Sequence, residues 1–324
     1  MDFDLLSGTA TGGDHIEAAT NGQDSFSIRV ADGSIVVVVA DGCSSQPHSE
    51  VGAKMVAPML ATFLEQAIRK GQSLEDQRIW NYLRDLLLAK ILSTATDMAG
   101  DHPVAPVLNK YFQFTLVGMV MTPQTTVFFS RGDGMFGING KVTTIEPEAG
   151  NRPAYLVYGL TRPDMVIDNP KLLDFDIQAV VPTPDVQSWW VGTDGVKEML
   201  KVVGQSVNGE KIVSIESLFD DQRYLDNPEL LCRRLQQLVV DNLIGDDITL
   251  VAGQRIPLPD DTPEVTAEET GEEVIEESSP APEDTVSIEE KDDPGKGQAA
   301  PAAGEPGSST TSSEKLESET GGDQ

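Results

Sequence analysis

Aspartate recurs where apolar, strand-like segments of this sequence end. Five segments carry it, and they read Asn21-Gly22-Gln23-Asp24-Ser25, Val39-Ala40-Asp41-Gly42, Arg131-Gly132-Asp133-Gly134, Gly192-Thr193-Asp194-Gly195 and Gly245-Asp246-Asp247-Ile248. Any one Asp-Gly pair is ordinary turn chemistry. As a set they indicate more, because carboxylates that converge from several strand ends repel one another unless cations neutralise them. Mg²⁺ and Mn²⁺ prefer such oxygen ligands, so the pattern indicates a site for divalent metal ions.

The segments that must position these aspartates alternate between strand and helix patterns. The continuous β-branched run at 34–40 predicts a buried strand that ends at Asp41. Apolar residues about four apart predict one helix over 51–69 and a second over 74–98. Asn139-Gly140 predicts a hairpin turn, and Pro228 predicts the first turn of a helix that runs to Val240. Further strands are expected at 112–121, 125–130, 172–181, 188–191 and 248–252.

The order of these elements bears on the fold class. Strands cluster with pairs of helices between them, which favours two sheets covered by helices over a strict βαβ repeat. Within the strand at 188–191, Trp189 and Trp190 are adjacent. We expect one indole ring in the core and the other against a helix, because neighbouring residues of a strand point to opposite faces.

The five aspartate segments, in this order, resemble the type 2C, metal-dependent (PPM) family of protein serine/threonine phosphatases, in its compact bacterial form. The resemblance covers roughly residues 8–253. It implies an α+β fold, an α-β-β-α sandwich of two antiparallel sheets flanked by helices. It also implies two Mn²⁺ or Mg²⁺ ions, with a third, weaker ion, and hydrolysis of phosphoserine and phosphothreonine in proteins by a metal-bridging hydroxide.

Site residues follow from the resemblance position by position. Asp41 would bridge the two metals, the Gly42 carbonyl would bind one of them, and Asp194 and Asp246 would be further ligands. Asp24 would hold metal-bound waters, and Asp133 matches the aspartate that serves the third ion. The catalytic residues implied are thus Asp41, Asp194 and Asp246.

The sequence also departs from the family pattern. No Arg precedes the Asn-x-x-Asp element, where many members place one to grip the phosphate, and His15 is the candidate substitute donor, although a surface or capping role is the plainer interpretation. Cys43 stands where animal members often have His as general acid, which leaves His48 as the only nearby imidazole. Gly134 replaces the common Ser after Asp133. These departures keep open an alternative, a catalytically inactive phosphatase fold that binds or regulates partners, although a complete set of aspartates argues against it.

Neither cysteine is set in the loop of a cysteine phosphatase, in which Arg lies six residues after the nucleophile. Cys43 is followed at that distance by Ser49, and Cys232 lies on the helix expected to end at Val240. Neither position offers the electropositive surroundings that lower a thiol pKa. Cys43 is therefore expected to be a small packing residue.

Charge and composition divide the chain near residue 256. The 324 residues carry a formal net charge of −30, and 20 of the 53 acidic but only three of the 23 basic side chains fall in 256–324. The sequence therefore predicts a phosphatase domain over 1–255 and an acidic, disordered tail over 256–324 that a partner could bind.

The acidic charge of the domain excludes a nucleic-acid-binding surface. The two cysteines form no disulfide framework, which favours a cytoplasmic protein, and the absence of a long apolar run predicts no membrane span. Expected partners are phosphoprotein substrates, the targets of a cognate serine/threonine kinase.

Overall fold

The strands assemble into two sheets in the computed structural model, which describes residues 3–147, 153–207 and 210–256. Both sheets have five strands, and every neighbouring pair is antiparallel. The first sheet has the order β1 (Phe3–Ala10), β12 (Ile248–Arg255), β9 (Ser188–Gly192), β6 (Gly134–Ile138) and β7 (Lys141–Ile145). The second has the order β2 (Ser25–Ala31), β3 (Ser34–Gly42), β4 (Phe114–Met121), β5 (Thr125–Arg131) and β8 (Asp176–Pro182).

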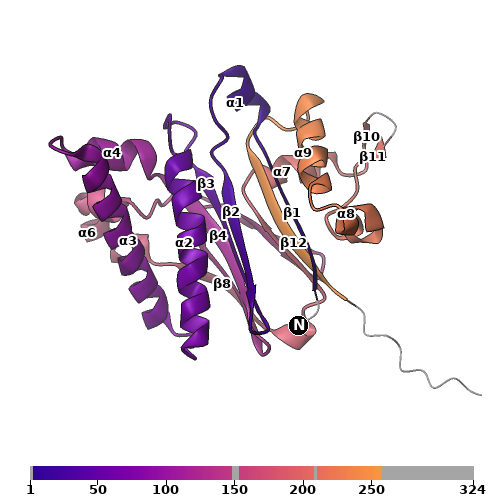
Figure 1. Ribbon diagram of the computed structural model, residues 1–324, viewed down its shortest axis with the longest axis horizontal. Coiled ribbons are helices and arrows are strands. Elements are labelled where there is room, and N and C mark those ends of the chain that lie inside the picture. The colour runs from indigo at the N-terminus through magenta and orange to yellow at the C-terminus, as the bar shows by residue number, and fades with distance from the viewer. Residues whose placement is uncertain (1–2, 148–152, 208–209, 257–324) are drawn as a thin grey trace, which may run out of the picture. The chain divides into compact units, whose positions relative to one another are not determined.

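Helices cover the outer face of each sheet (Figure 1). On the second sheet lie α2 (Glu50–Arg69), α3 (Gln77–Ala99) and α4 (Val104–Tyr111), and on the first lie α7 (Val196–Val202), α8 (Gln222–Asp226) and α9 (Leu230–Val240). The connections contain α1 (Gly13–Glu17), α5 (Tyr158–Thr161), α6 (Pro163–Asp168), the ribbon of β10 (Ser206–Val207) and β11 (Glu210–Lys211), and 3₁₀ turns at Pro170–Leu173, Thr183–Asp185 and Glu216–Asp220. This is the α-β-β-α sandwich, and the expected α+β class is confirmed.

Strand β3 shows why its sequence is apolar without alternation. Val36 and Val38 face the helices of the second sheet, whereas Val37 and Val39 face the layer between the sheets, and all four are at most 1% exposed. Both faces are therefore buried, and burying a Val side chain contributes about 1.5–3 kcal/mol. The strand is a firmly held support for Asp41, the residue that follows this run.

The two tryptophans behave as their alternation predicted. Trp189 packs in the layer between the sheets, and Trp190 packs in the cluster formed with α7 and α9. Glycines make room for both rings, since a Cβ at Gly253 or Gly137 would lie 2.4 Å or less from an indole atom. The strand before Asp194 is thus fixed on both of its faces.

Most elements expected from the sequence are present, with shifted ends. The hairpin turn is confirmed, because Asn139 and Gly140 both have positive φ, as a type I′ turn requires. The strand expected over 172–181 is partly wrong: Pro170–Leu173 is a 3₁₀ turn whose Leu172 and Leu173 are buried, and β8 begins only at Asp176. The helix expected from Pro228 begins at Leu230. Strands β1 and β2 had no prediction.

The expected domain boundary after residue 255 coincides with the last residue of β12. The acidic tail lies outside the described residues, so the division remains a prediction. None of the helices in the described ranges is long and apolar enough to cross a membrane.

Candidate metal site

Four aspartates from distant parts of the chain line one cavity of about 290 Å³. Asp41 is the last residue but one of β3, Asp133 precedes β6, Asp194 lies between β9 and α7, and Asp246 precedes β12. The other lining residues are Gly42, Cys43, Ser44, Ser45, Thr115, Pro153 and Tyr155. The structure therefore brings together five of the six positions proposed as metal ligands, with Asp24 as the exception.

Strand periodicity explains why these side chains meet. In β3, Val37 and Val39 point between the sheets, so Asp41, two residues further, points the same way at the open end of that layer. Its register partner on β4 is Thr115, which also lines the cavity and was not anticipated. The cavity lined by these carboxylates therefore lies at one end of the layer between the two sheets. We call it the carboxylate cavity.

Charge repulsion in this cavity is concentrated on Asp41. Burial raises the pKa of Asp41 well above its ordinary value, and repulsion from the other aspartates, which are Asp24, Asp194, Asp246 and Asp133, raises it further. Burial, followed by repulsion from Asp246 and Asp133, raises the pKa of Asp194 to about 6. Asp41 thus interacts with every other aspartate of the group, as Asp246 also does.

The remaining lining carboxylates show the same trend. Burial is the main cause that raises the pKa of both Asp133 and Asp246, and nearby carboxylates add to it. A buried, all-oxygen cluster of this kind favours occupation by hard cations. Within the described ranges no three Asp, Glu, His or Cys side chains form a ready-made ligand group for one ion. Mg²⁺ does not require one, because it keeps several waters and is often held by only one or two carboxylates. The donor set therefore fits divalent cations.

Asp24 lies behind the cavity rather than in its lining. Its carboxylate is 6% exposed and accepts a hydrogen bond from the Thr193 hydroxyl at 2.8 Å. The Thr193 oxygen accepts in turn from the Thr249 amide at 3.0 Å. The other oxygen, Asp24 Oδ1, is buried without a hydrogen-bond partner among the described residues. Burial and the neighbouring Asp247 raise the pKa of Asp24 well above its ordinary value. A water or cation close to Asp24 would satisfy this oxygen.

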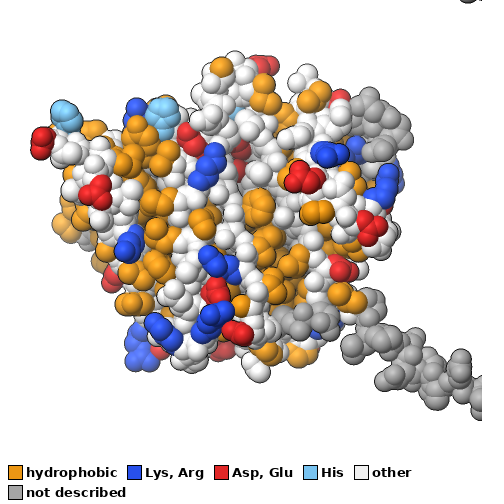
Figure 2. All heavy atoms as spheres, in the orientation of Figure 1, with side chains coloured by type: hydrophobic (Ala, Val, Ile, Leu, Met, Phe, Trp, Pro, Cys, Tyr) orange, Lys and Arg blue, Asp and Glu red, His pale blue; other side chains and the backbone are white. Residues whose placement is uncertain are grey.

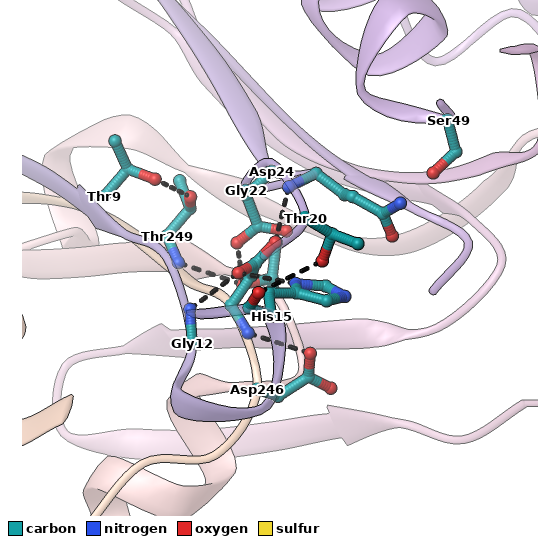
Figure 3. A network of polar contacts seen from close by, with 12 residues as sticks. Thr9, Gly12, His15, Thr20, Gly22, Asp24, Ser49, Asp246 and Thr249 are labelled. Atoms are coloured by element: carbon teal, nitrogen blue, oxygen red, sulfur yellow. Dashed lines mark hydrogen bonds and ion pairs between the residues drawn. The ribbon is translucent and has the colours of Figure 1, made fainter. Parts of the chain in front are cut away.

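A sixth carboxylate, Asp247, connects the loop before Asp24 with the strand after Asp246, and Figure 3 shows Gly12, His15 and Asp24 close together at this point. It is 3% exposed and accepts hydrogen bonds from the backbone amides of Gly12, at 2.7 Å, and Gln23. The chain approaches itself closely here, since a Cβ at Gly12 or Gly195 would lie within 2.2 Å of backbone atoms at 246–247. Asp247 thus fixes the loop before Asp24 against the strand after Asp246, a role that its sequence position did not indicate.

The two histidines considered from the sequence do not line the cavity. His15 Nδ1 lies 2.9 Å from Asp247 Oδ1, and the side chain is 12% exposed. His48 is 44% exposed, stacks on Tyr111 at 5.5 Å and lies 3.8 Å from Glu50. The imidazole of His15 contacts Asp247 here, and the phosphate-binding role considered for His15 stays a prediction.

Cys43 does line the cavity, beside a residue that was not anticipated. Its sulfur lies 3.1 Å from the Ser45 hydroxyl. Tyr155 lines the same wall, and burial, followed by a hydrogen bond with Cys43, raises the pKa of its phenol. No sequence signal marked Tyr155, because it belongs to the irregular connection between β7 and α5.

Comparison with known families decides what this arrangement belongs to. Residues 11–227, more than half of the chain, match the family model described as protein phosphatase 2C. The chain belongs to the protein phosphatase 2C family. This is a family of protein serine/threonine phosphatases, and the matched range contains the segments of Asp24, Asp41, Asp133 and Asp194.

Solved structures similar to this chain include three phosphatases. A bacterial serine phosphatase has a TM-score of 0.48 and 17% identity, over 79% of this chain and 99% of that one. The serine/threonine phosphatase Stp1 from Staphylococcus aureus has 0.46 and 15%, over 79% and 96%. A serine-threonine phosphatase 2C from Toxoplasma gondii has 0.48 and 14%, over 79% and 95%. No curated protein sequence matches this chain significantly.

Proposed function

We propose that this phosphatase 2C domain hydrolyses phosphoserine and phosphothreonine in proteins, with two Mn²⁺ or Mg²⁺ ions in the carboxylate cavity. The observation that supports this most is the convergence of Asp41, Asp133, Asp194 and Asp246 on one cavity from four separate parts of the chain. Substrates would be phosphoproteins, the targets of a cognate kinase.

The residues would divide the work by position. Asp41, whose charge interacts with all the neighbouring aspartates, would be shared between the two ions, and the Gly42 carbonyl would add a ligand to one. Asp194 and Asp246 would complete the ligand set, and Asp133 would serve a third ion. Asp24, oriented by the Thr193 hydroxyl, would hold ordered water with its buried Oδ1.

Divalent ions, when bound, supply Lewis-acid chemistry: they acidify water toward neutral pH and neutralise charge on phosphoryl oxygens. The protein's own part is to hold the ligands rigidly at and near strand ends. The five aspartates would be ionised together only when bound cations balance their charge. Neither this assignment nor the cavity requires a cysteine nucleophile.

One peptide in phosphoserine, phosphothreonine and phosphotyrosine forms tests this proposal. With the full chain and Mn²⁺, we expect phosphate release from the phosphoserine and phosphothreonine forms but not from the phosphotyrosine form. In EDTA we expect no release from any of the three. Binding of the peptide without any phosphate release in Mn²⁺ would instead favour the alternative, a catalytically inactive phosphatase fold that recognises partners.

A further inference from the structure

A cluster of cations lies on the helical side of the first sheet, away from the carboxylate cavity. Two cavities of about 260 and 210 Å³ share Arg223, Tyr224 and Arg234 as lining residues. Lys211 adds a cation to the larger cavity and Arg233 adds one to the smaller. We call the two cavities together the basic groove. Figure 2 shows basic side chains gathered on this side, where α9, β10 and β11 lie.

Helix α9 orients two of these cations by its periodicity. Leu231, Leu235 and Leu238 are buried against the sheet, so Arg233 points away from it, and Arg234 lies at the edge of the buried face. Arg233 is exposed, and Arg234 is half-buried. The cations thus have a fixed backbone support, which lowers the cost of ordering a bound segment.

The sign of the groove contrasts with that of the domain around it. Among its described lining residues Asp221 is the one carboxylate, and it is hydrogen-bonded to Arg223 at 2.6 Å. The described lining residues include four cations and one carboxylate, although residues 1–255 as a whole carry 33 acidic and 20 basic side chains. A basic surface on an acidic domain attracts acidic ligands locally while the rest of the surface repels them.

Apolar residues form the base of the larger cavity. Ile212, Leu218 and Leu238 are each at most 2% exposed and line it together with Met199. Cations above an apolar base suit a peptide that carries both carboxylates and an apolar side chain.

The spacing of the cations distinguishes an acidic segment from a single phosphate. Lys211 lines only the larger cavity and Arg233 only the smaller, while Arg223 and Arg234 line both, so the four cations extend along the two cavities. One phosphate group would meet the cations of one cavity only, whereas carboxylates spread along a peptide can meet the cations of both, one after another.

Helix α7 connects the groove with the carboxylate cavity. Asp194 lies just before α7, the Glu198 carboxylate accepts a hydrogen bond from the Gly245 amide at 2.7 Å, and Met199 lines the groove. A segment docked in the groove would therefore lie against the helix that supports two of the metal-site loops.

We propose that the basic groove binds an Asp/Glu-rich segment of the protein substrate, outside the residue to be dephosphorylated. Calling the bound segment part of a substrate rests on the proposed function, but binding of the segment requires no turnover. Loss of hydrolysis and loss of docking can therefore be measured separately.

Lys211→Gln/Arg233→Gln tests the groove, because both side chains are exposed and their replacement should leave the fold intact. Lys70→Gln/Lys90→Gln removes the same charge from exposed positions on the other helical layer and is the matched control. The probe is a fluorescent, phosphate-free peptide of alternating Glu and Leu, and its anisotropy is measured with each full-length variant.

We expect the groove variant to weaken the peptide Kd about five- to tenfold, as the loss of two exposed ion pairs allows, and the control variant to match the unmodified chain. On a phosphopeptide with the same acidic segment, KM should rise with kcat unchanged. Equal Kd for groove and control variants, or displacement of the peptide by inorganic phosphate at low millimolar concentration, would overturn the proposal. Tight peptide binding by a chain that hydrolyses nothing would instead overturn only the proposed function.

Discussion

The carboxylate cavity and the basic groove are built on opposite principles. The cavity collects like charges at the ends of buried strands, where burial and repulsion raise the pKa of Asp41 and its neighbours. The groove places its cations on β11, α8 and α9, with three of the four exposed. Repulsion is tolerated only where the scaffold cannot relax, which is why the cavity is the place where we propose that cations bind. The groove needs no such support and is suited to reversible contact.

The largest expected effect is that of Asp41→Asn, which removes the charge at the centre of the cavity. Metal-derived charge stabilisation amounts to several kcal/mol, so kcat/KM should fall by about 10²-fold or more. Asp97→Asn, on the exposed face of α3, is the matched control and should leave activity unchanged. Asp194→Asn and Asp246→Asn should also inactivate, whereas Asp133→Ala should keep the core metals and slow turnover. Asp41→Asn with ordinary activity would remove the distinction between the two regions.

Asp247→Ala should have the next largest effect, because it leaves the buried Gly12 and Gln23 amides without their acceptor. Each unsatisfied buried group costs about 1–3 kcal/mol, and disturbed support of metal ligands typically costs about 10–100-fold in metal affinity or activity. Asp247→Asn keeps a carbonyl acceptor and should recover part of both. Calorimetric Mn²⁺ titration and Tm measure the two losses, and an unchanged Mn²⁺ affinity in the Ala variant would show that Asp247 supports only the fold.

Removal of one carboxylate from the cavity should change how stability depends on pH. The pKa of Asp194 is raised from 3.8 to about 6, so its protonated form is favoured by folding, and the stability this confers is present below about pH 4 and lost as pH rises through 6. Without metal, Asp194→Asn should therefore match the unmodified chain near pH 4 and exceed it above pH 6, by at most about 3 kcal/mol. The exposed carboxylates are the same in the variant and the unmodified chain, so their contributions cancel in the difference in stability. Denaturant unfolding in EDTA measures this, and a less stable variant at pH 7 would contradict the assigned repulsion.

The smallest expected effects concern residues outside the metal chemistry. The groove variant Lys211→Gln/Arg233→Gln should hydrolyse a small phosphoester as the unmodified chain does, because such a substrate has no acidic segment to dock. Cys43→Ser/Cys232→Ser should keep most of its activity, since Ser preserves the small polar side chain beside Tyr155. Complete loss of turnover with intact metal binding in the cysteine variant would require a covalent phosphocysteine route.

Local patterns predicted much of the fold and the location of the site. Two strands and their ends could be predicted, from the β-branched run before Asp41 and from the tryptophan pair before Asp194. The positions of these two aspartates at strand ends followed from them. β1 was missed because it lies at the edge of its sheet and pairs only with β12, from the far end of the described chain. Tyr155 and the contact between His15 and Asp247 were missed for the same reason: long-range contacts leave no periodic signal in the sequence.

Metal-dependent hydrolysis of a generic phosphoester by the full chain tests the central claim most directly. After EDTA treatment and removal of the chelator, the account expects no phosphate release, recovery on titration with Mn²⁺ or Mg²⁺, and no recovery in a parallel Asp41→Asn sample. Full hydrolysis in the presence of EDTA would contradict a catalytic role for cations in the carboxylate cavity.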